Sequence, residues 1–100
     1  SETVSTIADR DQKAFSKVVL VDVYGSGIYM TGFVTDETNS EWYSIFVPTA
    51  PNPTNGFVLS TRRDAVIETD LKPEDAVRTV VGMGAGSTEI LGYLANAKKG

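Results

Sequence analysis

The sequence predicts a single α+β domain, built from a small, mostly antiparallel sheet or partly open β-barrel of about five strands. One or two C-terminal helices and a short N-terminal helix are expected to flank this sheet. Three observations carry the prediction. Short runs of alternating apolar residues fill the first part of the chain, glycine and proline separate these runs, and beyond residue 72 the apolar spacing becomes helical.

The first three strands follow from runs rich in valine and aromatic residues. Lys17 to Tyr24 and Ile28 to Thr35 flank Gly25-Ser26-Gly27, and a strand, a glycine turn and a strand predict a β-hairpin. Glu41 to Val47 predicts a third strand with apolar residues on both faces. We therefore expect one face to cover the core and the other to meet a helix or a second subunit.

Two shorter strands complete the predicted sheet. Phe57 to Thr61 forms the fourth strand, Arg62-Arg63-Asp64 a turn, and Ala65 to Thr69 the fifth strand. Because short strands with glycine bends curl easily, the sheet is expected to approach a small barrel. The predicted core comprises Val19, Val21, Ile28, Phe46, Leu59, Ile67, Val77 and Val80.

The C-terminal part predicts two helices. Pro73 suits the first position of a helix, and Glu74 and Asp75 suit its positive end. This helix buries Ala76, Val77, Val80 and Val81 and stops in Gly82-Met83-Gly84-Ala85-Gly86. The last helix spans Ser87 to Ala97, with Ser87 as its cap and with Ile90, Leu91, Tyr93 and Leu94 as its apolar stripe.

The whole chain, residues 1–100, is predicted to fold as one soluble domain without an internal boundary. Within residues 1–14, Val4, Ile7 and Ala8 recur at helical spacing, which predicts a short amphipathic helix over Ser1 to Lys13. From the residues alone, we expect this helix to pack on the domain or to fray. Residues 15–86 form the core region, and residues 87–100 form the C-terminal helix and tail.

The composition excludes several chemistries. Cysteine and histidine are both absent, which removes thiol nucleophiles, thiolate metal sites and the usual general base near neutral pH. The net charge is −4 without a basic cluster, so a nucleic acid partner is not expected. No apolar run approaches the roughly 20 residues that span a bilayer. We expect no enzyme activity, no catalytic residue, no metal and no cofactor.

The segment from Val47 to Phe57 contains three of the four prolines of the chain. Proline fixes φ and holds the preceding residue extended, so the segment is predicted to be a stiff, ordered loop. Ordered irregular loops often bind partners, because little entropy is lost on binding. The candidate interaction loop comprises Pro48, Thr49, Pro51, Asn52, Pro53, Thr54, Asn55, Gly56 and Phe57. The alternative is a rigid cross-connection that closes the barrel.

Three other segments carry weaker signals. Arg62 and Arg63 are a candidate anion or lipid-headgroup contact, although a solvated turn pair explains them as well. The glycine-rich segment at residues 82–86 follows a helix, which favours a helix terminator over a phosphate loop. The nearby carboxylates, Asp64, Glu68, Asp70, Glu74 and Asp75, lack the spacing of a calcium loop.

Four segments in order, together with the proline loop, carry a resemblance to a known family. They are Phe15-Ser-Lys-Val-Val-Leu-Val, Thr31-Gly-Phe-Val-Thr, Arg63-Asp-Ala-Val-Ile-Glu-Thr-Asp and Pro73-Glu-Asp-Ala-Val. From about Phe15 to Gly86 the chain resembles the soluble part of the LIKE-COV (continuous-vascular-ring) membrane proteins, domain-of-unknown-function family 502. Mild departures fall at Ala50, Asn55 and Lys72, where the family has Thr, Ser and a small capping residue.

The resemblance implies a membrane protein, in which residues 1–14 form a juxtamembrane-type helix whose apolar face meets a partner chain or a lipid surface. Family members carry two transmembrane helices upstream of this region, so the chain resembles an excised soluble domain that faces the cytoplasm. It implies a non-enzymatic interaction or oligomerisation domain that forms homo-oligomers, contacts other membrane proteins, and could support membrane transport or trafficking. The alternative from the residues is a regulatory domain that binds a small molecule or an anion.

Overall fold

The computed structural model describes residues 15–99. The helix predicted over residues 1–13 lies outside the described residues. The described elements are β1 (Val18–Asp22), β2 (Tyr29–Asp36), β3 (Trp42–Pro48), β4 (Gly56–Arg62), the 3₁₀ turn η2 (Arg63–Ala65), β5 (Val66–Glu68), α2 (Pro73–Val81) and α3 (Thr88–Lys99). These bounds confirm the predicted α+β class and lie close to the predicted element limits.

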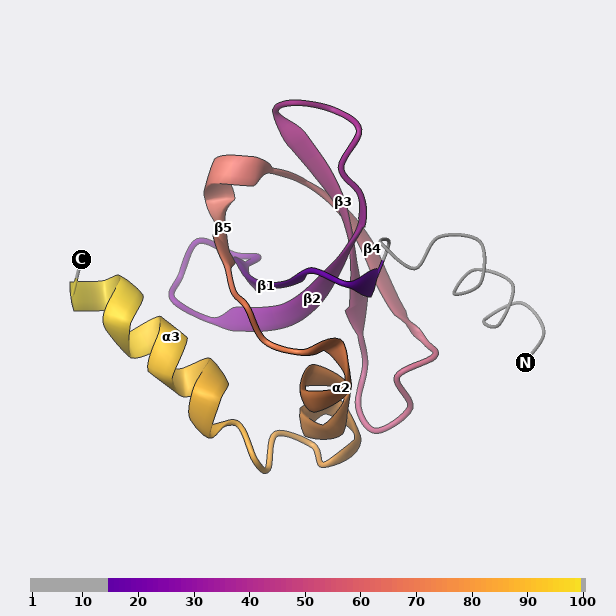
Figure 1. The fold of residues 1–100 in the computed structure, drawn as a ribbon, viewed down its shortest axis with the longest axis vertical. Coiled ribbons are helices and arrows are strands. Elements are labelled where there is room, and N and C mark those ends of the chain that lie inside the picture. The colour runs from indigo at the N-terminus through magenta and orange to yellow at the C-terminus, as the bar shows by residue number, and fades with distance from the viewer. Residues whose placement is uncertain (1–14, 100) are drawn as a thin grey trace.

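The five strands form one antiparallel sheet with the order β4-β3-β2-β1-β5. Consecutive strands pair from β1 to β4, and β5 returns to the free side of β1. The two edge strands are therefore neighbours in sequence, joined only by η2. Because so short a connection spans the two edges, the sheet curls into a half-open barrel (Figure 1).

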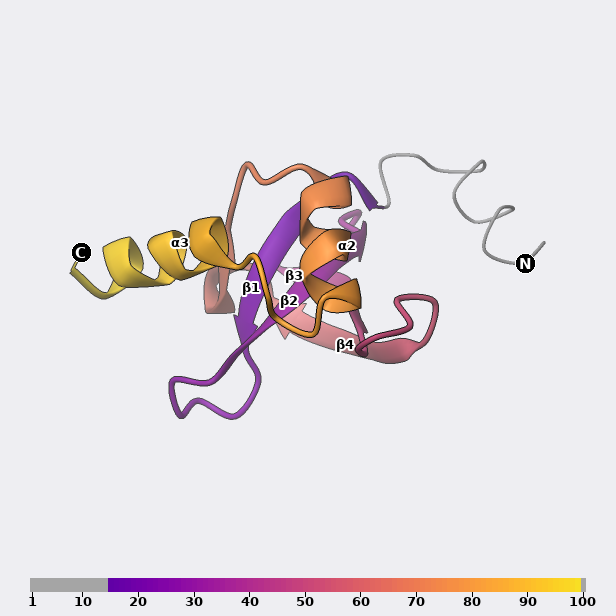
Figure 2. The same cartoon turned by 90° about the horizontal axis from the view of Figure 1, so that it is seen from below.

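Apolar side chains cover both faces of the curled sheet. On the convex face, sheet residues pack with α2 and α3, which lie on the same side of the sheet (Figure 2). This cluster comprises Val18, Leu20, Phe33, Leu71, Ala76 and Ile90. The concave face holds Val19, Val21, Val34, Tyr43, Ile45 and Val47. Since α3 contributes Ile90, residues 87–97 pack with the core region.

Most of the predicted core is confirmed. Val19 and Val21 are buried, and Phe46, Leu59, Ile67 and Val77 pack against the two clusters. Val80 is half-buried, whereas Val81, which the helical spacing also predicted to be buried, is 51% exposed.

Ile28 is the exception, because its side chain is 60% exposed. It lies in the loop before β2, where the Asp22 carboxylate accepts hydrogen bonds from the amides of Ser26 and Gly27 at 3.1 and 3.0 Å. These bonds hold a wide turn, so the second strand begins one residue later than predicted.

The glycine-rich segment ends α2, as predicted. The amide of Gly84 donates to the Thr79 carbonyl at 2.7 Å, and Gly84 has a φ of 98°, a left-handed conformation that glycine adopts without strain. Ser87 behaves differently from the prediction. Its hydroxyl donates to the Gly84 carbonyl at 2.7 Å and so ties down the preceding loop, while its carbonyl accepts the Leu91 amide.

Candidate interaction site

The proline loop connects the adjacent strands β3 and β4, which pair from Trp42↔Arg62 to Pro48↔Gly56. At its base, the amide and hydroxyl of Thr49 donate to the Asn55 carbonyl at 2.9 and 3.1 Å. The loop is thus the end of a β-hairpin. The alternative, a cross-connection that closes the barrel, is wrong, because the loop links two neighbouring paired strands and η2 connects the two edge strands.

Hydrogen bonds inside the loop hold it in a defined shape. The Asn52 side-chain oxygen accepts the amide and the hydroxyl of Thr54 at 3.1 and 2.7 Å, and the Ala50–Pro51 peptide bond is cis. The side chains of Asn52 and Thr54, which belong to the candidate interaction loop, therefore bond to each other within the loop. Pro51 is exposed, whereas Pro53 is half-buried and Pro48 is buried.

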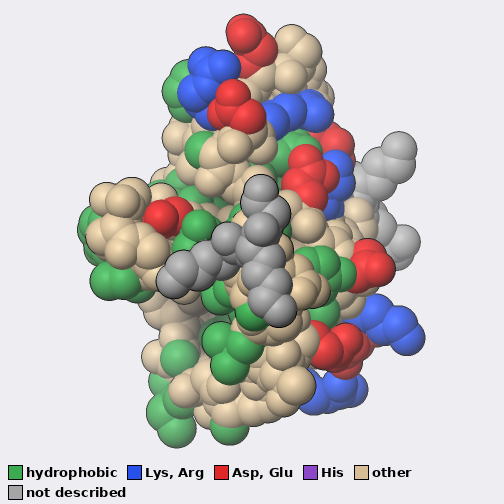
Figure 3. Space-filling view, turned by 90° about the vertical axis from the view of Figure 1, so that its left-hand side faces the viewer, with side chains coloured by type: hydrophobic (Ala, Val, Ile, Leu, Met, Phe, Trp, Pro, Cys, Tyr) green, Lys and Arg blue, Asp and Glu red, His purple; other side chains and the backbone are tan. Residues whose placement is uncertain are grey.

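The hairpin formed by β3, the proline loop and β4, here called the β3–β4 hairpin, carries no charge before its last residue, Arg62, and is partly exposed. From Trp42 to Thr61 the sequence contains no Asp, Glu, Lys or Arg. Three apolar side chains of the hairpin are nevertheless open to solvent, with Trp42 exposed by 45%, Phe57 by 57% and Val58 by 76%. Figure 3 shows the face opposite β4, on the left-hand side of Figure 1, where charged side chains gather at the top and right. The uncharged run is visible in the sequence and could have marked the surface of the hairpin.

The two arginines of the predicted anion contact have separate partners. The Arg63 guanidinium donates to the carbonyls of Glu37 and Asn39 at 2.5 and 2.7 Å and lies 4.5 Å from the centre of the Tyr43 ring. Arg62 instead contacts Asp64 at 3.4 Å and lies over the Trp42 ring. The structure therefore does not bring the two guanidiniums together on one free surface, and Arg63 secures the loop between β2 and β3.

A polar network that sequence reasoning missed joins separate elements at the rim of the barrel. The Tyr43 hydroxyl donates to the Glu68 carboxylate at 2.9 Å and accepts a bond from the Lys17 ammonium at 3.4 Å. Lys17 also pairs with Glu37 and Glu68 at 3.4 and 3.6 Å. The bond to Tyr43 is the largest effect and raises the pKa of Lys17 above its usual 10.5. Burial opposes it as the next largest effect, and the charge of Glu68 adds a smaller increase. Because these residues are far apart in sequence, no local pattern marks them.

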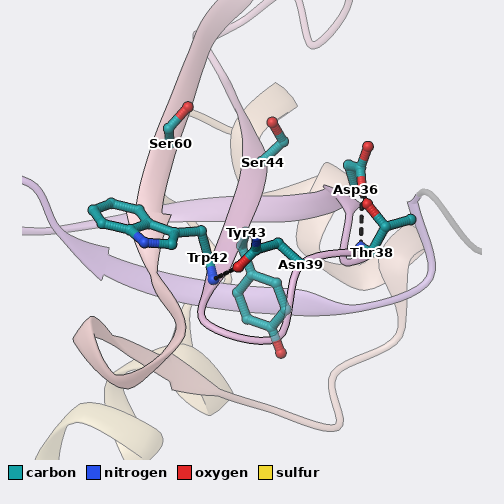
Figure 4. A pocket seen from close by; sticks show the side chains of 7 residues that line it. All are labelled: Asp36, Thr38, Asn39, Trp42, Tyr43, Ser44 and Ser60. Carbon is teal, nitrogen blue, oxygen red and sulfur yellow. Dashed lines mark hydrogen bonds between the residues drawn. The ribbon is translucent and has the colours of Figure 1, made fainter.

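A shallow hollow of about 250 Å³ lies beside this rim, at the end of the β3–β4 hairpin (Figure 4). Its lining comprises Asp36, Thr38, Asn39, Trp42, Tyr43, Ser44 and Ser60. The Asn39 side-chain oxygen accepts the Trp42 amide at 3.1 Å. The amide and hydroxyl of Thr38 donate to Asp36 and hold the pKa of that carboxyl below its usual 3.8.

The carboxylates between residues 64 and 75 have different partners. Glu68 accepts from Tyr43, Asp70 accepts from the Tyr93 hydroxyl, and Asp75 pairs with Arg78 at 2.6 Å. No group of three or more potential metal ligands occurs within the part of the chain that the structure describes. These carboxylates therefore serve separate local contacts of the fold.

The fold and this surface together define a half-open β-barrel with helices on its convex face and, at one edge, a partly exposed hairpin without charge from Trp42 to Thr61. The model of the family described as "Protein of unknown function (DUF502)" matches residues 1–55, over half of the chain. The chain belongs to this family, which confirms the predicted membership of domain-of-unknown-function family 502. No curated protein and no solved structure shows significant similarity to it. Among the described residues, the helices are too short or too polar to cross a membrane.

Proposed function

We propose that this chain is a non-enzymatic interaction domain that associates with copies of itself through the β3–β4 hairpin. The observation that supports it is the exposed, uncharged surface of this hairpin, where Phe57 and Val58 are more than half exposed. Burying such side chains on association is favourable by about 25 cal/mol for each Å² of apolar area. No charge between Trp42 and Thr61 would have to be desolvated, because this run has no charged residue.

The proline loop belongs to the same proposed surface. Its hydrogen-bonded shape means that little backbone freedom would be lost on association. Its exposed Pro51 extends the apolar surface next to β4.

The oligomeric state of the purified chain tests this proposal. Light scattering after size exclusion should give a multiple of the monomer mass, and replacing Pro51 and Pro53 by Ala should lower that mass with little change in Tm. The matched control is Pro73→Ala, which changes a helix start on another part of the surface. A variant at residues 51 and 53 that unfolds while its folded fraction assembles normally would restrict the loop to a structural role.

We further propose that the domain works as the cytoplasmic module of a small integral membrane protein, contacts other membrane proteins, and could support transport or trafficking. The support is the resemblance carried by the four segments and the proline loop. Reporter fusions to the full-length protein would show on which side of the membrane the domain lies. An exported reporter at the position of this domain would contradict the cytoplasmic placement.

The proposal is non-enzymatic because the sequence lacks histidine, the most frequent general base near pH 7, and cysteine, the nucleophile that ionises most readily. Screens for hydrolase, transferase and redox activity are expected to give no signal. A reproducible activity that disappears when one carboxylate is replaced would overturn this part of the proposal.

The hollow beside Trp42 favours a second candidate, a regulatory domain that binds a small molecule. The indole and two serine side chains line this hollow, and Trp42 is the only tryptophan of the chain. Titration with a library of small metabolites should then shift Trp42 fluorescence in the wild type and not in Ser60→Arg, which fills the hollow. A flat response to every compound would remove this candidate. Because Arg63 is held by two carbonyls, an anion is a less suitable ligand.

A further inference from the structure

The two edges of the sheet differ in how well they are protected against pairing. β5 is a three-residue strand that carries the charged Glu68, and short or charged edges resist the addition of a further strand. β4 is seven residues long, and its first six residues carry neither charge nor proline. An exposed, long, uncharged edge is a template for another strand. β4 therefore lacks the protection that β5 has.

The hydrogen-bond register shows which backbone groups of β4 are free. Thr49 donates to Asn55 just before the β3–β4 ladder, and Arg63 donates to Glu41 just after it. Bonded and non-bonded pairs alternate along an antiparallel ladder, so Phe57, Leu59 and Thr61 bond to β3. The amides and carbonyls of Val58 and Ser60 then point away from β3, toward the open edge.

We infer that the β4 edge pairs antiparallel with the β4 edge of a second copy. The two-fold axis of this pair passes between the two Val58 residues. This inference rests on the proposed self-association and specifies β4 as the strand through which two copies associate. In this register Val58 lies opposite Val58 of the second copy, and Gly56 lies opposite Ser60. The outward amide and carbonyl of each Val58 would bond to those of the other, as in a hydrogen-bonded antiparallel pair.

The side chains suit a second copy as the occupant. The most exposed apolar residue of the strand, Val58 at 76%, would lie at the two-fold axis, and Phe57 would lie across from Leu59 of the second copy on the concave side. Arg62 lies four positions from the axis, so the two Arg62 residues would be about 27 Å apart. That separation exceeds the Debye length of about 8 Å at physiological salt, and no like charges would face each other.

A proline at residue 58 tests the inference directly. Val58→Pro removes an amide that points away from β3, so the β3 ladder keeps its bonds, and proline is tolerated at such edge positions. The matched control Val58→Thr keeps the amide and a β-branched side chain. Sedimentation velocity should show assembly for the wild type and Val58→Thr. For Val58→Pro the dissociation constant should rise at least about tenfold, with a Tm close to that of the control.

Hydrogen exchange in the wild type gives a second test that does not depend on a folded proline variant. At high concentration the amides of Val58 and Ser60 should become protected, and on dilution they should lose protection, whereas Leu59 stays protected throughout. A wild type that assembles with Val58 and Ser60 unprotected overturns the β4 pairing and leaves self-association standing. A wild type that is monomeric at roughly millimolar concentration overturns both.

Discussion

Removing the hydroxyl of Tyr43 measures how strongly the rim network stabilises the barrel. The ring is buried, with 2% exposed, and its hydroxyl donates to Glu68 at 2.9 Å and accepts from Lys17 at 3.4 Å. Tyr43→Phe keeps the ring and deletes both bonds. The bonds join β3 to β5 and to the residue that precedes β1. Their loss should therefore weaken the attachment of β5 to the rest of the sheet.

The expected magnitude follows from the exposure of the partners. A hydrogen bond to a charged group contributes about 1.5–3 kcal/mol. The side chains of Lys17 and Glu68 are 31% and 49% exposed, so water can replace part of what is lost. Tyr43→Phe should therefore lower the free energy of unfolding by about 1–2 kcal/mol, with a fall in Tm of about 4–8 °C for each kcal/mol in a domain of this size.

Urea denaturation followed by circular dichroism gives the measurement. The control is Tyr24→Phe, because Tyr24 is 70% exposed and a change there should stay within about 0.5 kcal/mol. A double-mutant cycle with Glu68→Gln isolates the pair and should give a coupling of about 1 kcal/mol. If Tyr43→Phe is as stable as the control, the network contributes nothing and the reasoning is refuted.

Three further predictions concern the core, the β2–β3 loop and pH. Ile45→Ala, at a fully buried position, should cost about 2–5 kcal/mol in urea denaturation; an unchanged midpoint would contradict the concave core. Arg63→Lys should cost about 1–2 kcal/mol, because lysine lacks the planar fork that donates to two carbonyls, whereas Arg62→Lys should stay within about 0.5 kcal/mol. Because the folded-state pKa of Lys17 is raised above 10.5, its stabilisation is complete below pH 10.5 and is lost as pH rises through the folded pKa. Unfolding free energies measured from pH 8 to 12 should fall more steeply in wild type than in Lys17→Met, and parallel curves would exclude this linkage.

The elements themselves could be predicted from the sequence because their signals are local. Glycine and proline mark the turns, and the alternation in Trp42–Pro48 sets its two faces. The helix from Pro73 to Val81 begins and ends at the expected residues. Ile28 was wrongly predicted to lie in the second strand and in the core. The reason is that the Asp22 side chain, which lies outside the predicted turn, sets the width of the loop.

The candidate site could be predicted only in part. The stiffness of the proline loop follows from its residues, but the use of Asn52 to hold Thr54 does not. Which strands form the edges depends on β5 returning to β1, a long-range pairing. The place of β4 at an edge follows from that return, whereas Arg63 reaches its partners because the β3–β4 ladder sets it opposite Glu41. The uncharged run from Trp42 to Thr61 is the one local signal of the surface.

The mass of the purified chain in solution tests the central claim most directly. Sedimentation velocity over a range of concentrations should show a species heavier than one chain, which dissociates on dilution and is lost in Val58→Pro and retained in Val58→Thr. A single species with the mass of one chain at every concentration, up to roughly millimolar, would contradict the account of this protein as a self-associating domain.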